Sequence, residues 1–151
     1  MTTFLKDRTY WLALIAPILF WVTLLLFAEA PSDFRWPLKT PLPFLMLAVV
    51  YPIVEEIAFR GWLQETLHRY FKHRKWGVFS RANILTSIVF TAFHFLYHAP
   101  LWAASVFVPS LIFGYFKDRH QSLVSPIVLH VYYNTGYYLL FFNPHFQGFA
   151  D

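Results

Sequence analysis

The chain of 151 residues is 58% hydrophobic, 22% aromatic and only 13% charged, and it contains no cysteine. About a quarter of the residues of a soluble domain are charged, so this composition indicates an integral membrane protein. Without cysteine, disulfides, thiolate metal sites and a cysteine nucleophile are excluded.

The basic residues are placed as in membrane loops rather than as on a nucleic-acid-binding surface. Five of the 12 Lys and Arg residues lie in one polar loop between apolar segments: Arg69, Lys72, Arg74, Lys75 and Arg81. Such a cluster is typical of a loop that sets membrane topology. We therefore expect contact with the lipid bilayer and no nucleic-acid partner.

Uncharged stretches recur along the chain and predict the membrane spans. The first, 10–28, is long enough to cross a hydrocarbon core of about 30 Å. A second begins at Thr40 and continues towards Leu67. The uncharged stretch 82–116 is too long for one pass, and the proline at Pro100 divides it into two. The last stretch covers 121–142, which brings the count to about five spans.

These spans predict an all-α fold, a polytopic transmembrane bundle that forms one domain over residues 1–151. With five spans, nine of the Lys and Arg residues gather on one side of the membrane and two on the other. The positive-inside rule makes the richer side cytoplasmic. The N-terminus is then cytoplasmic, and the odd number of spans places the C-terminus outside.

The second predicted span carries three ionisable residues, Glu55, Glu56 and Arg60. An ionisable group in hydrocarbon costs at least about 2.5–3.5 kcal/mol, so each one needs a partner or a function. Glu56 and Arg60 lie four residues apart on one helix face, and we expect them to pair. Glu55 is turned about 100° from Glu56, which leaves it for another task. Pro52, one turn earlier, predicts a kink.

Two other predicted spans carry polar residues at similar depth. His94 lies on the third span, and His130 and Asn134 lie four residues apart on the fifth. Counted from the cytoplasmic ends at about 1.5 Å per residue, the three lie about 13–20 Å deep. Because isolated burial on each helix would cost more than a shared hydrated pocket, we expect one polar pocket open to the cytoplasmic side.

The available side chains restrict the chemistry. Peptide hydrolysis needs an activated water, an acid or base, and a group that holds the oxyanion. Every Asp lies outside the predicted spans, which excludes an intramembrane aspartyl pair, and the H-E-x-x-H motif of zinc proteases is absent. No Ser lies in a nucleophile motif. Carboxylate and imidazole remain, with Glu55 as the group that takes a proton from water.

Three motifs resemble those of the CPBP intramembrane proteases, a family of CAAX proteases and bacteriocin-processing enzymes. Glu55 to Arg60 matches E-E-x-x-x-R, Phe90 to His94 matches F-x-x-x-H, and His130 to Asn134 matches H-x-x-x-N. The motifs occur in order, each on a predicted span, in a motif core of about 42–138.

The resemblance implies an intramembrane endopeptidase that cleaves a membrane-anchored protein or lipidated peptide near its C-terminus. It implies that Glu55 and His94 activate the water and that Glu56 and Arg60 form a structural pair. His130 and Asn134 would complete the site on the oxyanion side, and we expect no cofactor. With only five predicted spans, bacteriocin or sorting-signal substrates suit the chain as well as prenylated CAAX substrates. We expect a prokaryotic inner-membrane protein.

Two alternatives remain open. In a metal-dependent version of the same protease, Glu55, His94 and His130 would be three ligands of a divalent ion. A non-enzymatic membrane immunity or carrier protein could use the buried Glu/His cluster as a proton relay. A carrier usually has repeated halves, and no repeat is found in the sequence.

Overall fold

The computed structural model describes residues 4–27 and 34–141, and these form an almost entirely helical protein. The predicted all-α class is confirmed. The helices, in chain order, are a 3₁₀ turn η1 (Phe4–Lys6), α1 (Arg8–Phe27), α2 (Trp36–Lys39), α3 (Pro41–Leu45), α4 (Tyr51–Glu56), α5 (Glu65–Phe71), α6 (Arg81–His94), α7 (Pro100–Ser105), α8 (Phe107–His120) and α9 (Val124–Phe141). A short antiparallel pair, β1 (Lys75–Trp76) and β2 (Phe79–Ser80), turns the chain between α5 and α6.

Helices α3, α4 and α5 form one long helix, because two π-helical segments join them without a break. These segments are η2 (Met46–Val50) and η3 (Ile57–Gln64). Pro52 follows η2, so the disturbance predicted at this proline takes the form of a wider π turn. A proline has no N–H, and its ring clashes with a carbonyl one α-turn earlier; a π turn relieves that clash. The long helix ends at Phe71, and Lys72 follows in the left-handed conformation with φ 49°.

Two helices in the described part of the chain are long and apolar enough to cross a membrane: Arg8–Phe27 and the long helix Pro41–Phe71. They correspond to the first two predicted spans. The stretch 82–116 does divide, since α6 ends at His94 and α7 begins at Pro100, and a second interruption occurs at Val106. The count of five spans stays a prediction. The predicted outer tail, 143–151, lies outside the described residues.

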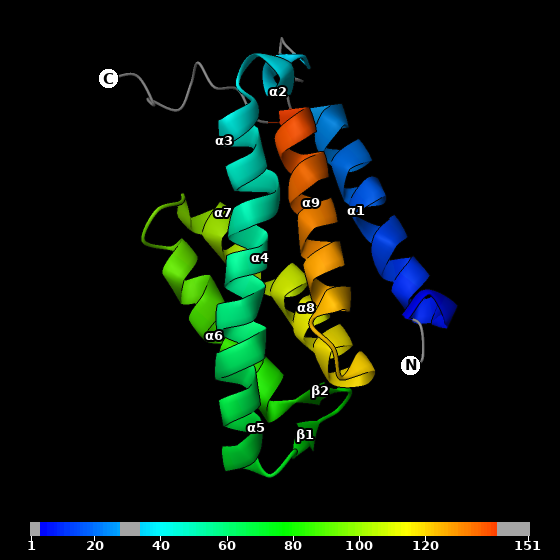
Figure 1. Ribbon diagram of the computed structural model, residues 1–151, viewed down its shortest axis with the longest axis vertical. Coiled ribbons are helices and arrows are strands. Elements are labelled where there is room, and N and C mark those ends of the chain that lie inside the picture. Colours follow the sequence, from blue (N-terminus) through cyan, green and yellow to red (C-terminus); the bar gives the residue numbers. More distant parts are fainter. Residues whose placement is uncertain (1–3, 28–33, 142–151) are drawn as a thin grey trace.

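Helix α9 is the centre of the packing. It contacts α1, α8 and the η2–α4 part of the long helix, and Figure 1 shows it between α1 and α4. Gly136 permits the close approach of α1, because a Cβ there would lie 2.1 Å from the Trp21 ring. Beneath this contact, Tyr10, Phe113 and Leu129 form part of a buried apolar cluster.

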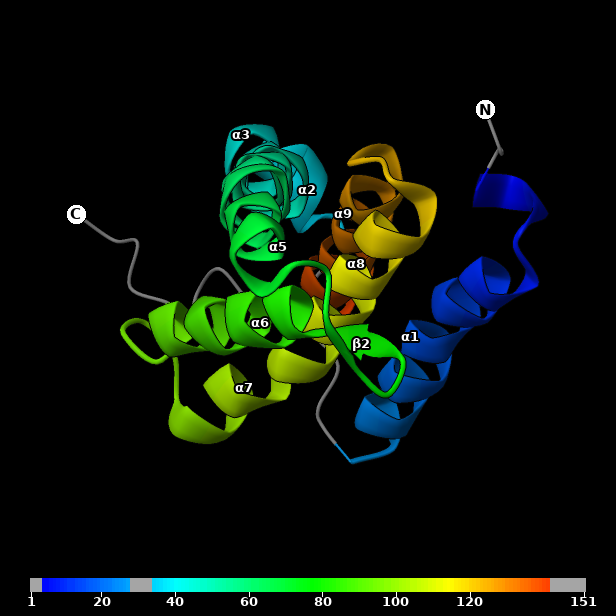
Figure 2. The ribbon, with the colours of Figure 1, turned by 90° about the horizontal axis from the view of Figure 1, so that it is seen from below.

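The end of the molecule that carries the β1–β2 pair is held by Asp118 of α8. Its carboxylate accepts hydrogen bonds from Gln64 Nε2 (2.7 Å) and Ser80 Oγ (2.6 Å), and it lies 2.6 Å from His68 Nε2. Ser80 Oγ also caps α6 by accepting the Asn83 N–H at 2.9 Å. These contacts hold α5, α6 and α8 together, and Figure 2 shows the three helices near one another in the view from below.

Candidate active site

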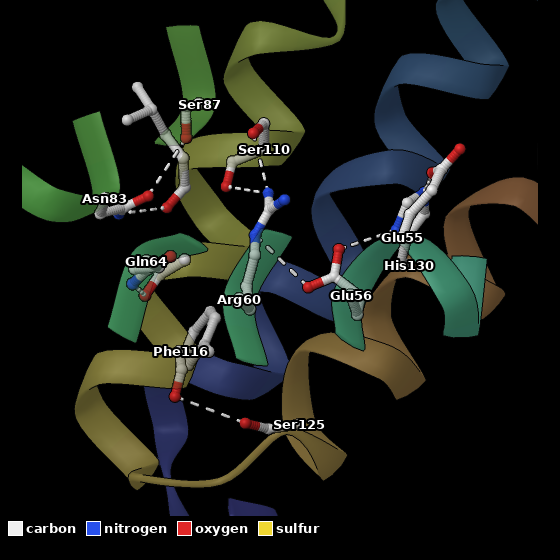
Figure 3. A network of polar contacts seen from close by, with 12 residues as sticks. Glu55, Glu56, Arg60, Gln64, Asn83, Ser87, Ser110, Phe116, Ser125 and His130 are labelled. Atoms are coloured by element: carbon white, nitrogen blue, oxygen red, sulfur yellow. Dashed lines mark hydrogen bonds and ion pairs between the residues drawn. The ribbon is translucent and has the colours of Figure 1, made fainter. Parts of the chain in front are cut away.

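Glu56 and Arg60 form a buried ion pair on the long helix. Both side chains are fully buried, and Arg60 Nε lies 3.4 Å from Glu56 Oε2. Arg60 Nη2 donates to the Ser110 carbonyl (2.9 Å) and to the Ser110 hydroxyl oxygen (2.8 Å) on α8. The structure thus brings together the two side chains that the spacing paired, and it adds an acceptor from a second helix (Figure 3).

His130 of α9 lies between the two carboxylates. Its Nδ1 is 2.9 Å from Glu56 Oε1, whereas its Nε2 is 3.6 Å from Glu55 Oε2. The first contact is a hydrogen bond in which Nδ1–H donates to the carboxylate, and the second is too long for one. Glu56 is therefore engaged on both oxygens. The Glu55 side chain is 33% exposed and keeps an oxygen accessible.

Aromatic rings enclose this polar cluster. Phe113 of α8 stacks on the His130 imidazole with ring centroids 4.7 Å apart. The Arg60 guanidinium lies over the Phe90 ring of α6, with Cζ 4.9 Å from the centroid. A cation over an aromatic face is favourable in a dry environment, where the ring replaces part of the lost hydration. The rings thus cover part of the Arg60 guanidinium and one face of the His130 imidazole.

His94 is the last residue of α6 and lies across Phe90 from His130. Its Nδ1 is 2.9 Å from the Phe90 carbonyl oxygen, which can only accept, so Nδ1 carries the hydrogen. In a neutral ring Nε2 is then an acceptor. Phe90 contacts both imidazoles, with centroids 4.5 Å from His94 and 6.0 Å from His130. Within the described residues no hydrogen bond or ion pair joins His94 to either glutamate.

Asn134 of α9 forms a hydrogen bond with the backbone of the long helix, a contact that its spacing from His130 did not predict. Its Nδ2 donates to the Leu47 carbonyl oxygen at 3.2 Å. In η2 the Tyr51 N–H donates to the carbonyl of Met46, five residues back. By the same register the donor for Leu47 would be the N–H of residue 52, which is a proline and has none. Asn134 therefore satisfies the carbonyl that Pro52 leaves without a backbone partner.

Glu55, His94 and His130 are not arranged as a ligand set. In residues 4–27 and 34–141, no group of three or more His, Cys, Asp or Glu side chains could hold a metal ion. His130 donates Nδ1–H to Glu56, and its other ring nitrogen, Nε2, lies 3.6 Å from Glu55 Oε2. The side-chain geometry gives no support to the metal-dependent alternative.

Ser110 lies in no nucleophile motif, yet it accepts two hydrogen bonds from Arg60, one on its carbonyl oxygen and one on its hydroxyl oxygen. The sequence contains a pattern that indicates this helix contact. Ser110 and Gly114 form a small-x-x-x-small pattern on one face of α8, which is typical of close helix contacts in membranes. A Cβ at Gly114 would lie 1.9 Å from Asn83 Oδ1 of α6. The small face allows α8 to approach the long helix and α6.

These observations define a helical membrane protein with a buried cluster of carboxylates, imidazole and guanidinium contributed by the long helix and α9. Residues 37–136 match the family model described as type II CAAX prenyl endopeptidase Rce1-like. The chain belongs to this family, which confirms the resemblance seen in the motifs. Comparison with curated proteins gives no match, and neither does comparison with solved structures. All three motifs lie within the matched range.

Proposed function

We propose that this protein is an intramembrane endopeptidase that hydrolyses a peptide bond of a membrane-anchored protein or peptide near its C-terminus. The observation that supports this most is that two adjacent glutamates differ in burial and in their partners. Glu56 is fully buried and engaged by Arg60 and His130, whereas Glu55 is partly exposed and has no hydrogen bond to another described side chain. The family match points to the same activity.

In this proposal Glu55 is the general base. It takes a proton from a water molecule, and the resulting hydroxide attacks the carbonyl carbon of the scissile bond. Glu55 then delivers that proton to the leaving amine as the C–N bond breaks. A carboxylate with an accessible oxygen is required for both steps, and Glu56 lacks one.

The imidazoles have complementary tasks. Nε2 of His94 accepts a hydrogen bond from the water and orients it towards the carbonyl, since Nδ1 is committed to Phe90. His130 donates Nδ1–H to Glu56, and this bond fixes its Nε2 edge beside Glu55, where a proton on Nε2 would serve the developing oxyanion. Asn134, one turn further along α9, fixes this helix against the long helix through Leu47 and so positions His130.

The test is cleavage by the purified full chain in proteoliposomes. Wild-type protein is incubated with membrane-anchored peptides that carry a prenylated CAAX end, a bacteriocin leader or a C-terminal sorting signal, and mass spectrometry identifies new termini. Glu55→Gln should lower turnover by about 10²–10⁴-fold, the usual contribution of a general base. A second series with chelators present tests the metal-dependent version, in which cleavage would be lost.

Glu65→Gln is the matched control, because Glu65 lies on the same long helix but pairs with Lys117 at the polar end. It should leave turnover unchanged. Normal turnover by Glu55→Gln would refute the assignment of the base. If the wild type produces no new termini from any substrate, the endopeptidase proposal fails and the carrier or immunity alternative takes its place.

We also propose that the end with the β1–β2 pair faces the cytoplasm. Five Lys and Arg residues between Arg69 on α5 and Arg81 at the start of α6 support this orientation. Reporters inserted within Lys72–Lys75 and fused after Asp151 should report opposite sides of the membrane. Reports from the same side would contradict an odd number of spans.

A further inference from the structure

A cavity of about 500 Å³ lies outside the active site, between the end of α5, β1 and the first two turns of α6. Lys75 and Arg81 supply its cationic groups, and Ile84, Leu85 and Ile88 supply its apolar wall. Figure 1 shows β1 beside the end of α5 and away from α4, the part of the long helix that carries Glu55 and Glu56.

The residues of α6 that line the cavity change from charged to apolar along the helix. Arg81, Ile84, Leu85 and Ile88 follow one another at intervals of three, one and three residues, which places them on one helix face. The charged residue is at the start of the helix, and the apolar stripe extends about 10 Å beyond it at about 1.5 Å per residue. The cavity therefore has a cationic end and an apolar end.

The two cations have no acidic partner within the described residues, unlike their neighbours. Lys117 pairs with Glu65 and Arg119 pairs with Asp7 at the same end of the molecule. Lys75 and Arg81 are exposed, and no described carboxylate forms an ion pair with either one. Two uncompensated cations beside an apolar cavity call for an anionic ligand that also has an apolar part.

The position of the cavity identifies the class of ligand. It lies where the long candidate span ends at Phe71, and Trp76, which also lines it, is 76% exposed. Tryptophan and basic residues together are typical of the boundary between hydrocarbon and lipid headgroups. Leu85 and Ile88 are exposed apolar residues on α6, so the wall of the cavity continues into a surface that hydrocarbon chains would cover.

We propose that this cavity is a binding site for an anionic phospholipid. The phosphate lies between Lys75 and Arg81, which donate charge-assisted hydrogen bonds to its oxygens. One acyl chain follows Ile84, Leu85 and Ile88 along α6. Basic pockets between helices at the cytoplasmic face of membrane proteins recognise anionic lipid headgroups in this way. The site is separate from the proposed catalytic groups, so it stands whether or not the protein is a protease.

The test is lipid binding by the full chain in detergent, followed by native mass spectrometry. Dioleoylphosphatidylglycerol should bind more tightly than dioleoylphosphatidylcholine, which has the same chains and no net charge. The variant Lys75→Gln/Arg81→Gln should bind phosphatidylglycerol about 30-fold more weakly, from about 1 kcal/mol for each basic residue near a membrane surface. Leu85→Trp, which fills the apolar end and keeps both charges, should also weaken binding.

The matched control is Arg69→Gln/Arg74→Gln, which removes the same charge from the same end of the molecule at exposed residues that do not line the cavity. It should leave phosphatidylglycerol binding unchanged. Equal loss in the control would mean that diffuse loop charge, and not this site, holds the lipid. Equal binding of the two lipids, or full competition by glycerol 3-phosphate, would also overturn the proposal. Thermal unfolding of each variant establishes that it is folded.

Discussion

Asn134→Ala should destabilise the protein because it removes the donor that satisfies the Leu47 carbonyl, and the size of the loss should depend on Pro52. The bond from Asn134 Nδ2 is 3.2 Å long and joins α9 to η2. Inside a membrane no water is available to hydrogen-bond a carbonyl that has lost its donor, so the folded state carries the full desolvation cost of that carbonyl. We expect a loss of about 1–3 kcal/mol in the free energy of unfolding.

The dependence on Pro52 separates this cause from a simple loss of packing. In Pro52→Ala the backbone N–H of residue 52 becomes available to Leu47, as the Tyr51 N–H is to Met46. Asn134→Ala should then cost less in the Pro52→Ala background than in the wild type. The difference between the two costs is the coupling energy, expected at about 1–2 kcal/mol for groups that share one partner.

The assay is reversible unfolding of the full chain in mixed micelles, with SDS as denaturant and tryptophan fluorescence as the signal. Thr135→Ala is a control on the same helix, because its hydroxyl forms no hydrogen bond with any other described residue. It should show no coupling to Pro52→Ala. Equal losses from Asn134→Ala in both backgrounds would refute the view that Asn134 compensates for the proline.

Arg60→Met should lower the free energy of unfolding by about 3–5 kcal/mol, because it leaves Glu56 buried without its cation. Glu56→Gln/Arg60→Met should lose less than the sum of the two single losses. Strict additivity would mean that the pair does not interact. Glu55→Ala and His94→Ala should each lower turnover by about 10²–10⁴-fold, and the double variant should be little slower than either, as in a catalytic unit; a fully multiplicative loss would separate them. Gly136→Ala should lower the free energy of unfolding in SDS by about 1–3 kcal/mol, because its methyl group overlaps the Trp21 ring of α1. Unchanged stability would mean that the ring can move aside.

The helices were predictable where the signal is local. Uncharged length identified α1 and the long helix, and the preference of residues before proline against helix located the break ahead of Pro100. The π-helical form of η2 and η3 was not predictable, because a change of register depends on which distant donors satisfy the displaced carbonyls. The donor from Asn134 to Leu47 is 87 residues away along the chain.

In the site, too, contacts within one helix were predictable from the sequence and contacts between helices were not. The spacing of Glu56 and Arg60 placed them on one helix face, and their short distance in the structure follows from that spacing alone. The hydrogen bond from His130 to Glu56 depends on how α9 packs on the long helix, and no spacing within one helix contains that information. The contact of Ser110 was not predictable from nucleophile motifs, because its hydroxyl oxygen is an acceptor for a buried cation.

The position of α9 late in the chain determines when the site can assemble during biosynthesis. It carries His130, which lies 74 residues after Glu56, and it is the last described helix to leave the ribosome. Until then Glu56 lacks one of its two partners and α1 lacks the surface on which it packs. A partly translated chain therefore cannot hold an assembled site, and in the proposed function it cannot cleave a substrate before α9 has entered the membrane.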